Sequence, residues 1–173
     1  MRRHLTAGLA AVCLAVGAAF AIAPTASAGP LDATCTGTVA VDYSPGLTLT
    51  AQTVTASATS TYPSCLTSQT GVTSASASGS VTDTLDCNSL LTTTTGVKTY
   101  HWNDGTTSRF EYTRTGTRVL SQTVVTFTGT ITSGKFSGDT AVETNIAANL
   151  GLLDCLAPGG VTHVDFTALV ELT

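Results

Sequence analysis

Threonine and serine alternate with apolar or small residues along most of this chain. Between residues 125 and 132, for example, Val125, Phe127 and Ile131 alternate with threonines. Successive side chains of a β-strand face opposite sides, so this pattern predicts strands with one apolar and one solvated face. Threonine supplies 34 of the 145 residues from Gly29 onward, and its β-branched side chain suits a half-solvated sheet. The alternation therefore indicates an all-β domain of antiparallel strands.

Turn-forming residues divide the alternating segments into about eight expected strands. The turns include Ser44-Pro45-Gly46, Asn103-Asp104-Gly105 and Pro158-Gly159-Gly160. The expected strands cover residues 35–43, 51–62, 72–85, 96–102, 106–114, 119–132, 138–147 and 161–172. Eight strands with short connections predict an antiparallel β-sandwich of the immunoglobulin-like or Greek-key kind. A closed eight-stranded up-and-down β-barrel is the alternative.

The N-terminus has the three parts of a secretory signal peptide. Arg2 and Arg3 precede an apolar run from residue 5 to residue 23, and Ala26-Ser27-Ala28 forms a small-x-small cleavage site. We therefore expect residues 1–28 to be removed and residues 29–173 to form a single all-β domain. The mature protein is predicted to be secreted and extracellular, with no membrane insertion once the signal peptide has been removed.

Four cysteines follow the expected signal peptide, namely Cys35, Cys65, Cys87 and Cys155. An even number of cysteines in an exported chain predicts two disulfides. Spacing alone leaves three pairings open. If successive strands alternate in direction, the first two cysteines lie at one end of the strands and the last two at the other end. This placement favours the pairs Cys35–Cys65 and Cys87–Cys155.

The charge of the mature segment limits its partners. Residues 29–173 contain 5 lysines and arginines against 11 aspartates and glutamates, a formal net charge of −6. Nucleic acids and anionic membranes are bound by cationic surfaces, so neither is an expected partner. Only 10% of the whole chain is charged and 42% is hydrophobic, a composition that excludes an ordinary disordered tail.

Aromatic residues flank the expected turn Asn103-Asp104-Gly105. A two-residue turn would pair even-numbered residues of one strand with odd-numbered residues of the other. A three-residue loop with a left-handed Gly105 instead pairs even-numbered residues with even-numbered ones. We expect the three-residue loop, because it places the aromatic side chains on one face and polar side chains on the other. The aromatic face consists of Tyr100, Trp102, Phe110 and Tyr112. It is interpreted as core, and the alternative is a candidate ligand-binding platform.

The sequence offers no catalytic or metal-binding motif. Residues 129–135 match most of a phosphate-binding loop, but Phe136 replaces the required hydroxyl and the segment alternates as a strand. His101 and His163 are expected on solvated faces, and His163 with Asp165 is interpreted as a solvated pair rather than a metal site. We therefore expect no enzyme activity, no metal and no cofactor.

Residues 149–156 are apolar without alternation. We expect a short helical turn there, held by Cys155, at one open end of the β-structure. Two interpretations remain open for this segment. It either buries its leucines as a plug, or it serves as a lid or a partner-binding patch.

Several segments resemble a family of small exported proteins of actinobacteria. These segments are CTGT at 35–38, YSPGLTLT at 43–50, WNDGTTS at 102–108, GTITSGKF at 129–136 and LLDCLAPGG at 152–160. They extend over nearly the whole mature chain, and they consist of turns and cysteines rather than chemically reactive groups. The resemblance implies export and a β-fold, and it assigns no activity or catalytic residue to this sequence.

These observations predict a non-enzymatic module that binds an extracellular ligand or surface. Two other functions stay open. A small apolar-ligand carrier would use residues 149–156 as its lid. A hydrolase would use carboxylates contributed by distant strands, which sequence spacing cannot reveal.

Overall fold

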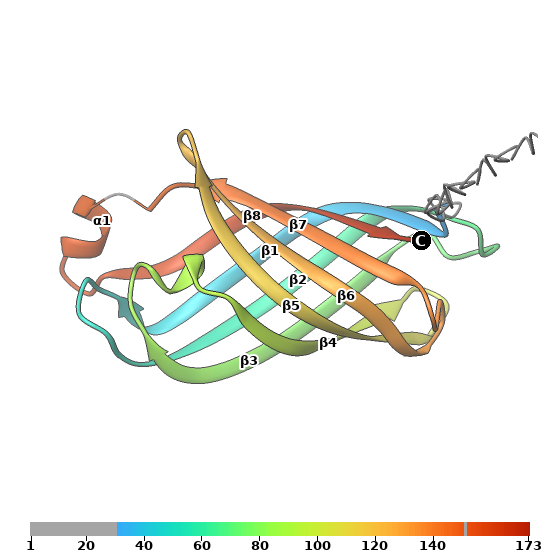
Figure 1. Cartoon of the computed structure of the whole chain (residues 1–173), viewed down its shortest axis with the longest axis horizontal. Helices are drawn as coiled ribbons and strands as arrows, with labels where there is room; N and C mark the ends of the chain where they lie inside the picture. Colours follow the sequence, from blue (N-terminus) through green and yellow to red (C-terminus); the bar gives the residue numbers. More distant parts are fainter. Residues whose placement is uncertain (1–30, 151) are drawn as a thin grey trace, which may run out of the picture.

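Pairing between the last strand and the first closes the sheet into a barrel. The computed structural model describes residues 31–150 and 152–173, so the expected signal peptide at residues 1–28 lies outside the described residues. Eight antiparallel strands follow one another around the barrel in sequence order (Figure 1). They are β1 (Ala33–Leu47), β2 (Gln52–Thr67), β3 (Ala75–Leu85), β4 (Thr94–Trp102), β5 (Thr107–Val119), β6 (Gln122–Gly134), β7 (Thr140–Ala148) and β8 (Val161–Leu172).

The predicted β-sandwich is wrong, and the closed up-and-down barrel is the fold that forms. Each strand pairs with the strands next to it in sequence, so no Greek-key crossover occurs among the eight strands. β1 pairs with β8 from Ala33 opposite Leu172 to Asp42 opposite His163. A sandwich and a barrel share the same alternation of apolar and polar residues. The β1–β8 pairing decides between them, and alternation carries no information about it.

The hydrophobic core fills the lumen of the barrel. From Val164 to Leu172 on β8 the residues of even number are buried and their neighbours are more exposed, as the alternation predicts. The largest side chains with almost no exposure include Tyr62, Tyr100, Phe110 and Ile131. Side chains rather than open space therefore occupy much of the interior, as is usual for eight strands.

The β4–β5 hairpin has the register that the sequence predicts. Gly105 lies in the left-handed region with φ of 82°. The Gly105 amide donates to the Trp102 carbonyl at 3.0 Å, and the Trp102 amide donates to the Thr106 carbonyl at 2.9 Å. Tyr100 consequently faces Ser108 across the hairpin, a pairing of equal parity. The three-residue loop is confirmed, and the aromatic side chains share one face.

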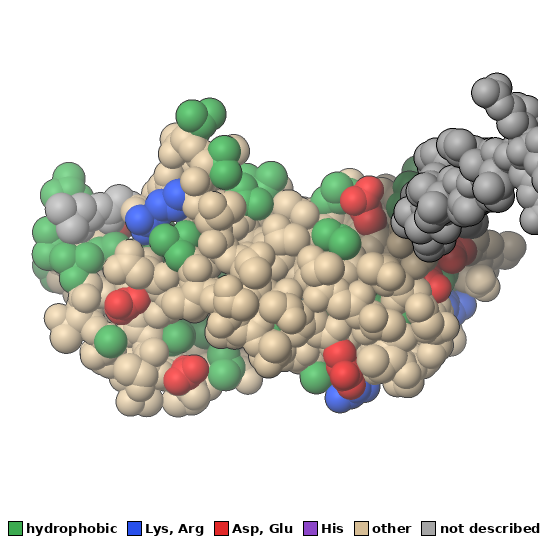
Figure 2. All heavy atoms as spheres, viewed as in Figure 1, with side chains coloured by type: hydrophobic (Ala, Val, Ile, Leu, Met, Phe, Trp, Pro, Cys, Tyr) green, Lys and Arg blue, Asp and Glu red, His purple; other side chains and the backbone are tan. Residues whose placement is uncertain are grey.

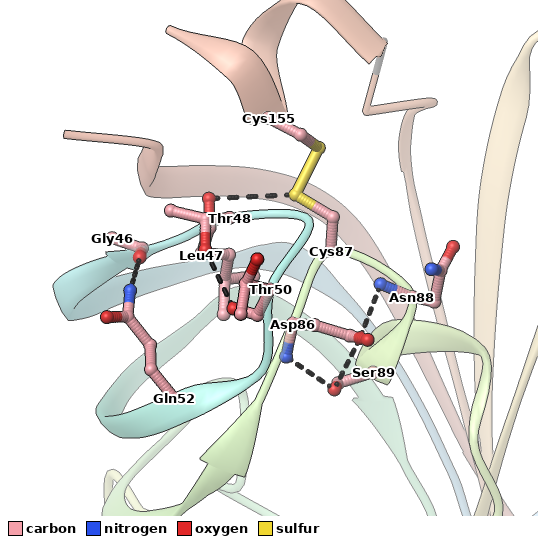
Figure 3. The surroundings of a disulfide bond; sticks show 10 residues. All are labelled: Gly46, Leu47, Thr48, Thr50, Gln52, Asp86, Cys87, Asn88, Ser89 and Cys155. Atoms are coloured by element: carbon pink, nitrogen blue, oxygen red, sulfur yellow. Dashed lines mark hydrogen bonds between the residues drawn. A yellow bond between two sulfur atoms is a disulfide. The ribbon is translucent and has the colours of Figure 1, made fainter. Parts of the chain in front are cut away.

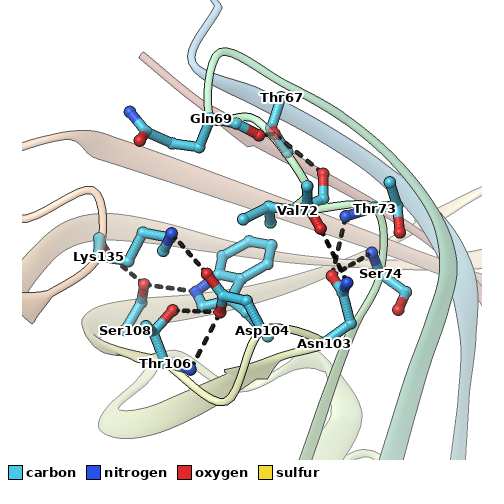
Figure 4. A network of polar contacts seen from close by, with 12 residues as sticks. Thr67, Gln69, Val72, Thr73, Ser74, Asn103, Asp104, Thr106, Ser108 and Lys135 are labelled. Carbon is cyan, nitrogen blue, oxygen red and sulfur yellow. Dashed lines mark hydrogen bonds and ion pairs between the residues drawn. The ribbon is translucent and has the colours of Figure 1, made fainter.

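Asn103 ties this hairpin loop to the segment that precedes β3 (Figure 4). Its Oδ1 accepts from the amides of Thr73 and Ser74 at 2.9 and 3.2 Å, and its Nδ2 donates to the Gly71 carbonyl at 2.9 Å. Asp104 forms an ion pair with Lys135 at 2.7 Å, and this lysine together with Thr106 lowers the pKa of Asp104 to about 2. These contacts fix the end of the barrel at which β3 and β4 meet.

Two disulfides hold opposite parts of the barrel, in the pairing that alternating strand directions favour. Cys35 and Cys65 are directly opposed on β1 and β2. Cys87 and Cys155 join the chain after β3 to the short helix α1 (Leu152–Leu156). Figure 3 shows this second disulfide beside the β1–β2 turn, where the Cys87 amide donates to the Thr48 carbonyl at 2.9 Å. Disulfides of this kind indicate an oxidising environment.

The α1 segment leaves part of its apolar surface in solvent. Cys155 is buried and Leu150 packs against the core, but Leu153 and Leu156 are 81% and 59% exposed. Leu120 at the tip of the β5–β6 hairpin is 97% exposed. Figure 2 shows hydrophobic side chains at this hairpin tip and around α1, on a surface that otherwise carries few charges. The segment therefore does not bury all its leucines as a plug would.

The helices of this fold are short. α1 has 5 residues, and the 3-10 helix η1 (Ser89–Leu91) between β3 and β4 has 3. Within residues 31–150 and 152–173, no helix has the length and apolarity needed to cross a membrane.

Candidate functional site

The predicted aromatic face lies inside the barrel rather than on its surface. Tyr100, Trp102 and Phe110 are 1%, 4% and 0% exposed, and Tyr112 is half-buried. The Tyr100 and Phe110 rings stack with centroids 6.0 Å apart. The Trp102 indole packs against Phe136 and donates to Ser108 Oγ at 2.8 Å. These side chains form core, and they offer no exposed stacking platform.

This burial gives a direct expectation for fluorescence. Trp102 is the single tryptophan of the chain, so emission reports on its site alone. We expect blue-shifted emission and weak quenching by acrylamide, because the indole is enclosed by aromatic neighbours. Strong quenching with red-shifted emission would place the indole in solvent and contradict the hairpin packing.

A buried ion pair spans the lumen beside this aromatic cluster. Lys98 on β4 donates to both carboxylate oxygens of Glu143 on β7, each at 2.7 Å. The Glu143 side chain is 0% exposed and that of Lys98 is 15% exposed. The Tyr100 hydroxyl and the Asn145 amide also donate to Glu143, at 2.6 and 2.9 Å. The Lys98 ammonium lies 4.9 Å from the centre of the Phe127 ring. Strands from opposite sides of the barrel thus meet in one polar cluster.

The electrostatics of the cluster keep Glu143 ionised. Burial alone raises the pKa of a carboxyl, since the charged form loses its hydration. The Lys98 ammonium and the two other donors, Tyr100 and Asn145, outweigh this effect, so the pKa of Glu143 lies below its ordinary value. Burial raises the pKa of Tyr100 well above its usual range, and the Glu143 charge raises it further. The cluster therefore holds one positive and one negative charge and is neutral overall.

Three polar atoms next to this ion pair form no hydrogen bond of good geometry. They are Ser60 Oγ, Tyr62 OH and Asn145 Oδ1. Their residues are 1%, 0% and 4% exposed. Burial and the nearby Glu143 charge raise the pKa of Tyr62 well above its usual range, so its hydroxyl stays protonated. The Tyr62 hydroxyl lies within interaction distance of Ser60 and Glu143, and its contact with Ser60 lowers the pKa in part. Buried polar groups in folded proteins are almost always paired with protein groups or with water, so a bound water or ligand would complete the hydrogen bonding of this cluster.

The wall of the barrel is open between β3 and β4, the strands next to this cluster. These strands pair at only two positions, Ala75 with Trp102 and Ser76 with His101. Residues 77–85 of β3 and 94–100 of β4 have no partner across this seam. By contrast, β2 and β3 pair along the full length of β3. Figure 1 shows β3 and β4 separating toward the end of the barrel that carries α1. We call this opening the β3–β4 gap.

Side-chain exposure and space along β3 agree with an opening. Ala75 and Ala77 face the lumen and are buried, whereas Val81 on the same face is 58% exposed. A Cβ atom added at Gly79, between them, would meet no heavy atom within 4 Å. The inner face of β3 is therefore sealed near Ala77 and open to solvent farther along the strand.

Shallow hollows lie on the outer wall on both sides of the seam. One of about 580 Å³ covers β4, β5 and β6, and its lining includes Val97, Glu111 and several threonines. Another of about 330 Å³ lies where β3 and β4 are paired, around Pro63 and His101. Tyr62 lines the second hollow, but Lys98, Glu143 and Asn145 line neither of them, so neither hollow contains the polar cluster as a whole.

The other charged residues noted in the sequence lie on the outer wall. His163 contacts Asp42 through Nδ1 at 2.7 Å and Asp165 through Nε2 at 3.1 Å. Both carboxylates raise the pKa of His163. Arg109 pairs with Glu111 on the exposed face of β5. Within residues 31–150 and 152–173, no group of three or more His, Cys, Asp or Glu side chains could hold a metal ion.

Sequence reasoning missed Lys98, Glu143 and Asn145 as members of a site. One signal was available for Lys98. It lies two residues before Tyr100 and four before Trp102 along the strand, and so belongs to the same aromatic, inward face. Comparison of the chain with models of protein families, with curated proteins and with solved structures found no match in any of the three.

Proposed function

We propose that this protein is a secreted, non-enzymatic binding module whose ligand enters the barrel wall at the β3–β4 gap. One observation carries the proposal, namely a cluster of buried polar atoms without well-formed hydrogen bonds, Asn145 Oδ1 among them, beside the unpaired edges of β3 and β4. A ligand that pairs these atoms would remove a desolvation cost that the free protein carries. The two disulfides and the expected signal peptide support export.

The same geometry disfavours the other two functions. An apolar ligand would have to displace or cover the Lys98–Glu143 pair, because this pair crosses the lumen. A hydrolase would need a carboxylate free to move a proton. Glu143 instead accepts from Lys98, Tyr100 and Asn145, and its lowered pKa keeps it ionised. The cluster is therefore better suited to recognition than to proton transfer.

Amide chemical shifts of the ¹⁵N-labelled, disulfide-bonded protein test this proposal. The probes are a mixture of soluble cello- and chito-oligosaccharides and, separately, a tryptic digest of reduced casein. We expect one of these mixtures to shift the amide signals of residues 77–85 and 94–100. The proposal fails if neither mixture shifts these amides, or if the shifts lie only on the outer faces of β6, β7 and β8.

A further inference from the structure

We infer that the ligand of the β3–β4 gap is an extended peptide segment that adds a strand to the open barrel wall. This inference rests on the proposed function and names its ligand class. In an antiparallel sheet, successive residues direct their N–H and C=O groups alternately to the two neighbouring strands. About half of the backbone groups of residues 77–85 and 94–100 therefore point into the gap, where no strand meets them.

The free edge of β3 is suited to strand addition. β3 pairs with β2 without a register shift from Ala75 opposite Tyr62 to Leu85 opposite Gln52, so its edge is regular. Natural edge strands are usually protected by bulges, prolines or lysines. β3 has no proline or lysine, and Asp83 is its one charged residue. The Thr84 amide donates at 2.7 Å to the Asp83 carboxylate.

The free edge of β4 faces the same opening. Its other edge pairs with β5 from Thr94 opposite Arg114 to His101 opposite Thr107. Val97 on β4 and Val81 on β3 are 51% and 58% exposed. Main-chain hydrogen bonds to either edge would give an incoming peptide its affinity, and alternate side-chain positions would give it specificity.

The polar cluster defines which peptide side chains fit. Alternate side chains of an added strand point toward the lumen, where Asn145 Oδ1 has no partner and Ser60 and Tyr62 present hydroxyl groups. The lumen side of β3 is lined by Ala77 and Gly79 and has room for small side chains. Because Lys98 and Glu143 neutralise each other, an additional charge would lack a counter-ion. The preferred inward side chains are therefore small, polar and uncharged, such as serine, threonine or asparagine.

A matched pair of synthetic peptides tests this inference. The first has the length of β4, 9 residues, and alternates threonine with valine, with lysines added at its ends for solubility. The second has the same sequence with N-methyl groups on alternate backbone nitrogens, which removes donors and keeps the side chains. We expect the N-methylated peptide to bind at least about tenfold more weakly by fluorescence anisotropy, because its strand hydrogen bonds are lost. Equal binding of the two peptides would overturn the inference.

Two substitutions locate the binding. Val81→Lys places a charge on the free edge of β3 and is expected to weaken peptide binding. Val119→Lys is the matched control, because Val119 is 50% exposed and lies at the far end of β5. The Val119→Lys protein should bind the peptide with the affinity of the unmodified protein. Equal affinity of the Val81→Lys and unmodified proteins would contradict strand addition at this edge.

The same measurements separate this inference from the proposed function. In one outcome, oligosaccharides alone shift the amide signals of the gap, while the peptides and the casein digest have no effect. That result would support the proposed binding module and overturn strand addition by a peptide. If neither peptides nor oligosaccharides shift the amide signals of residues 77–85 and 94–100, the proposed function and the strand-addition inference are both overturned.

Discussion

Lys98→Met is expected to lower the free energy of unfolding by about 3–5 kcal/mol near neutral pH, since it leaves the Glu143 carboxylate buried without its counter-ion. The carboxylate would keep the Tyr100 and Asn145 donors, but these carry no full positive charge. Urea unfolding followed by far-UV circular dichroism measures the loss. A change below about 1 kcal/mol would show that the ion pair is not buried as described.

The pH dependence of this loss identifies its cause. In the unmodified protein the pKa of Glu143 is lowered, so its contribution to stability is present above the ordinary glutamate range and is lost as pH falls through the folded-state pKa. In Lys98→Met, burial without the ammonium raises the pKa, and the carboxyl becomes neutral on mild acidification. The difference between the two proteins should therefore shrink toward about pH 4. A difference independent of pH would point to lost packing instead.

The double substitution Lys98→Met with Glu143→Leu is the matched control. It removes both charges and keeps apolar volume, a change that is often neutral or stabilising for buried ion pairs. We expect it to recover most of the stability lost in Lys98→Met. If Lys98→Met fails to fold, recovery of a folded protein by the second substitution still attributes the defect to the unpaired carboxylate.

Removing the Cys87–Cys155 disulfide is expected to destabilise the protein by about 4 kcal/mol and to lower Tm by roughly 10 °C. The two cysteines are 68 positions apart, so the cross-link restricts a long loop of the unfolded chain. This disulfide also holds α1, whose Leu153 and Leu156 leave most of their surface in solvent. Calorimetry of Cys87→Ser with Cys155→Ser under oxidising conditions measures the effect.

The second disulfide supplies the control for this prediction. Cys35 and Cys65 are 30 positions apart, and their strands stay paired without the bond. Cys35→Ser with Cys65→Ser should therefore cost less than loss of the Cys87–Cys155 bond. A larger loss for the Cys35–Cys65 pair would show that loop length does not govern the contribution of either disulfide.

Local patterns were sufficient to predict the strands and the aromatic hairpin. The β4–β5 register follows from the chemistry of Gly105 and from the separation of aromatic and polar side chains. The choice of barrel over sandwich could not be made in this way. It depends on β8 pairing with β1, a contact between the two ends of the domain that alternation does not encode.

The polar cluster escaped prediction because β7 reverses the usual pattern. Glu143 and Asn145 face the lumen on this strand, whereas the more apolar Val142 and Ile146 are half-buried on the outer face. Hydrophobicity alone would orient the strand the other way. The inward orientation becomes favourable once Lys98, on the opposite side of the barrel, supplies a counter-ion. That partner is 45 residues away in sequence.

The β3–β4 gap could not be predicted for a related reason. Residues 75–81 alternate small and polar side chains as a paired strand would. Whether their outer edge is paired depends on where β4 lies after the η1 connection. Small residues such as Gly79 are equally compatible with a packed or an open lumen, so the sequence pattern does not distinguish the two.

Amide hydrogen exchange of the free protein, resolved by NMR, tests most directly whether the barrel wall is open for a ligand. If the gap exists, alternate amides within residues 77–85 and 94–100 should exchange at rates close to those of an unfolded chain, while amides of β6, paired on both sides, stay protected. Uniform slow exchange along both segments, matching that of β6, would mean that β3 and β4 are paired throughout and that the barrel wall has no gap.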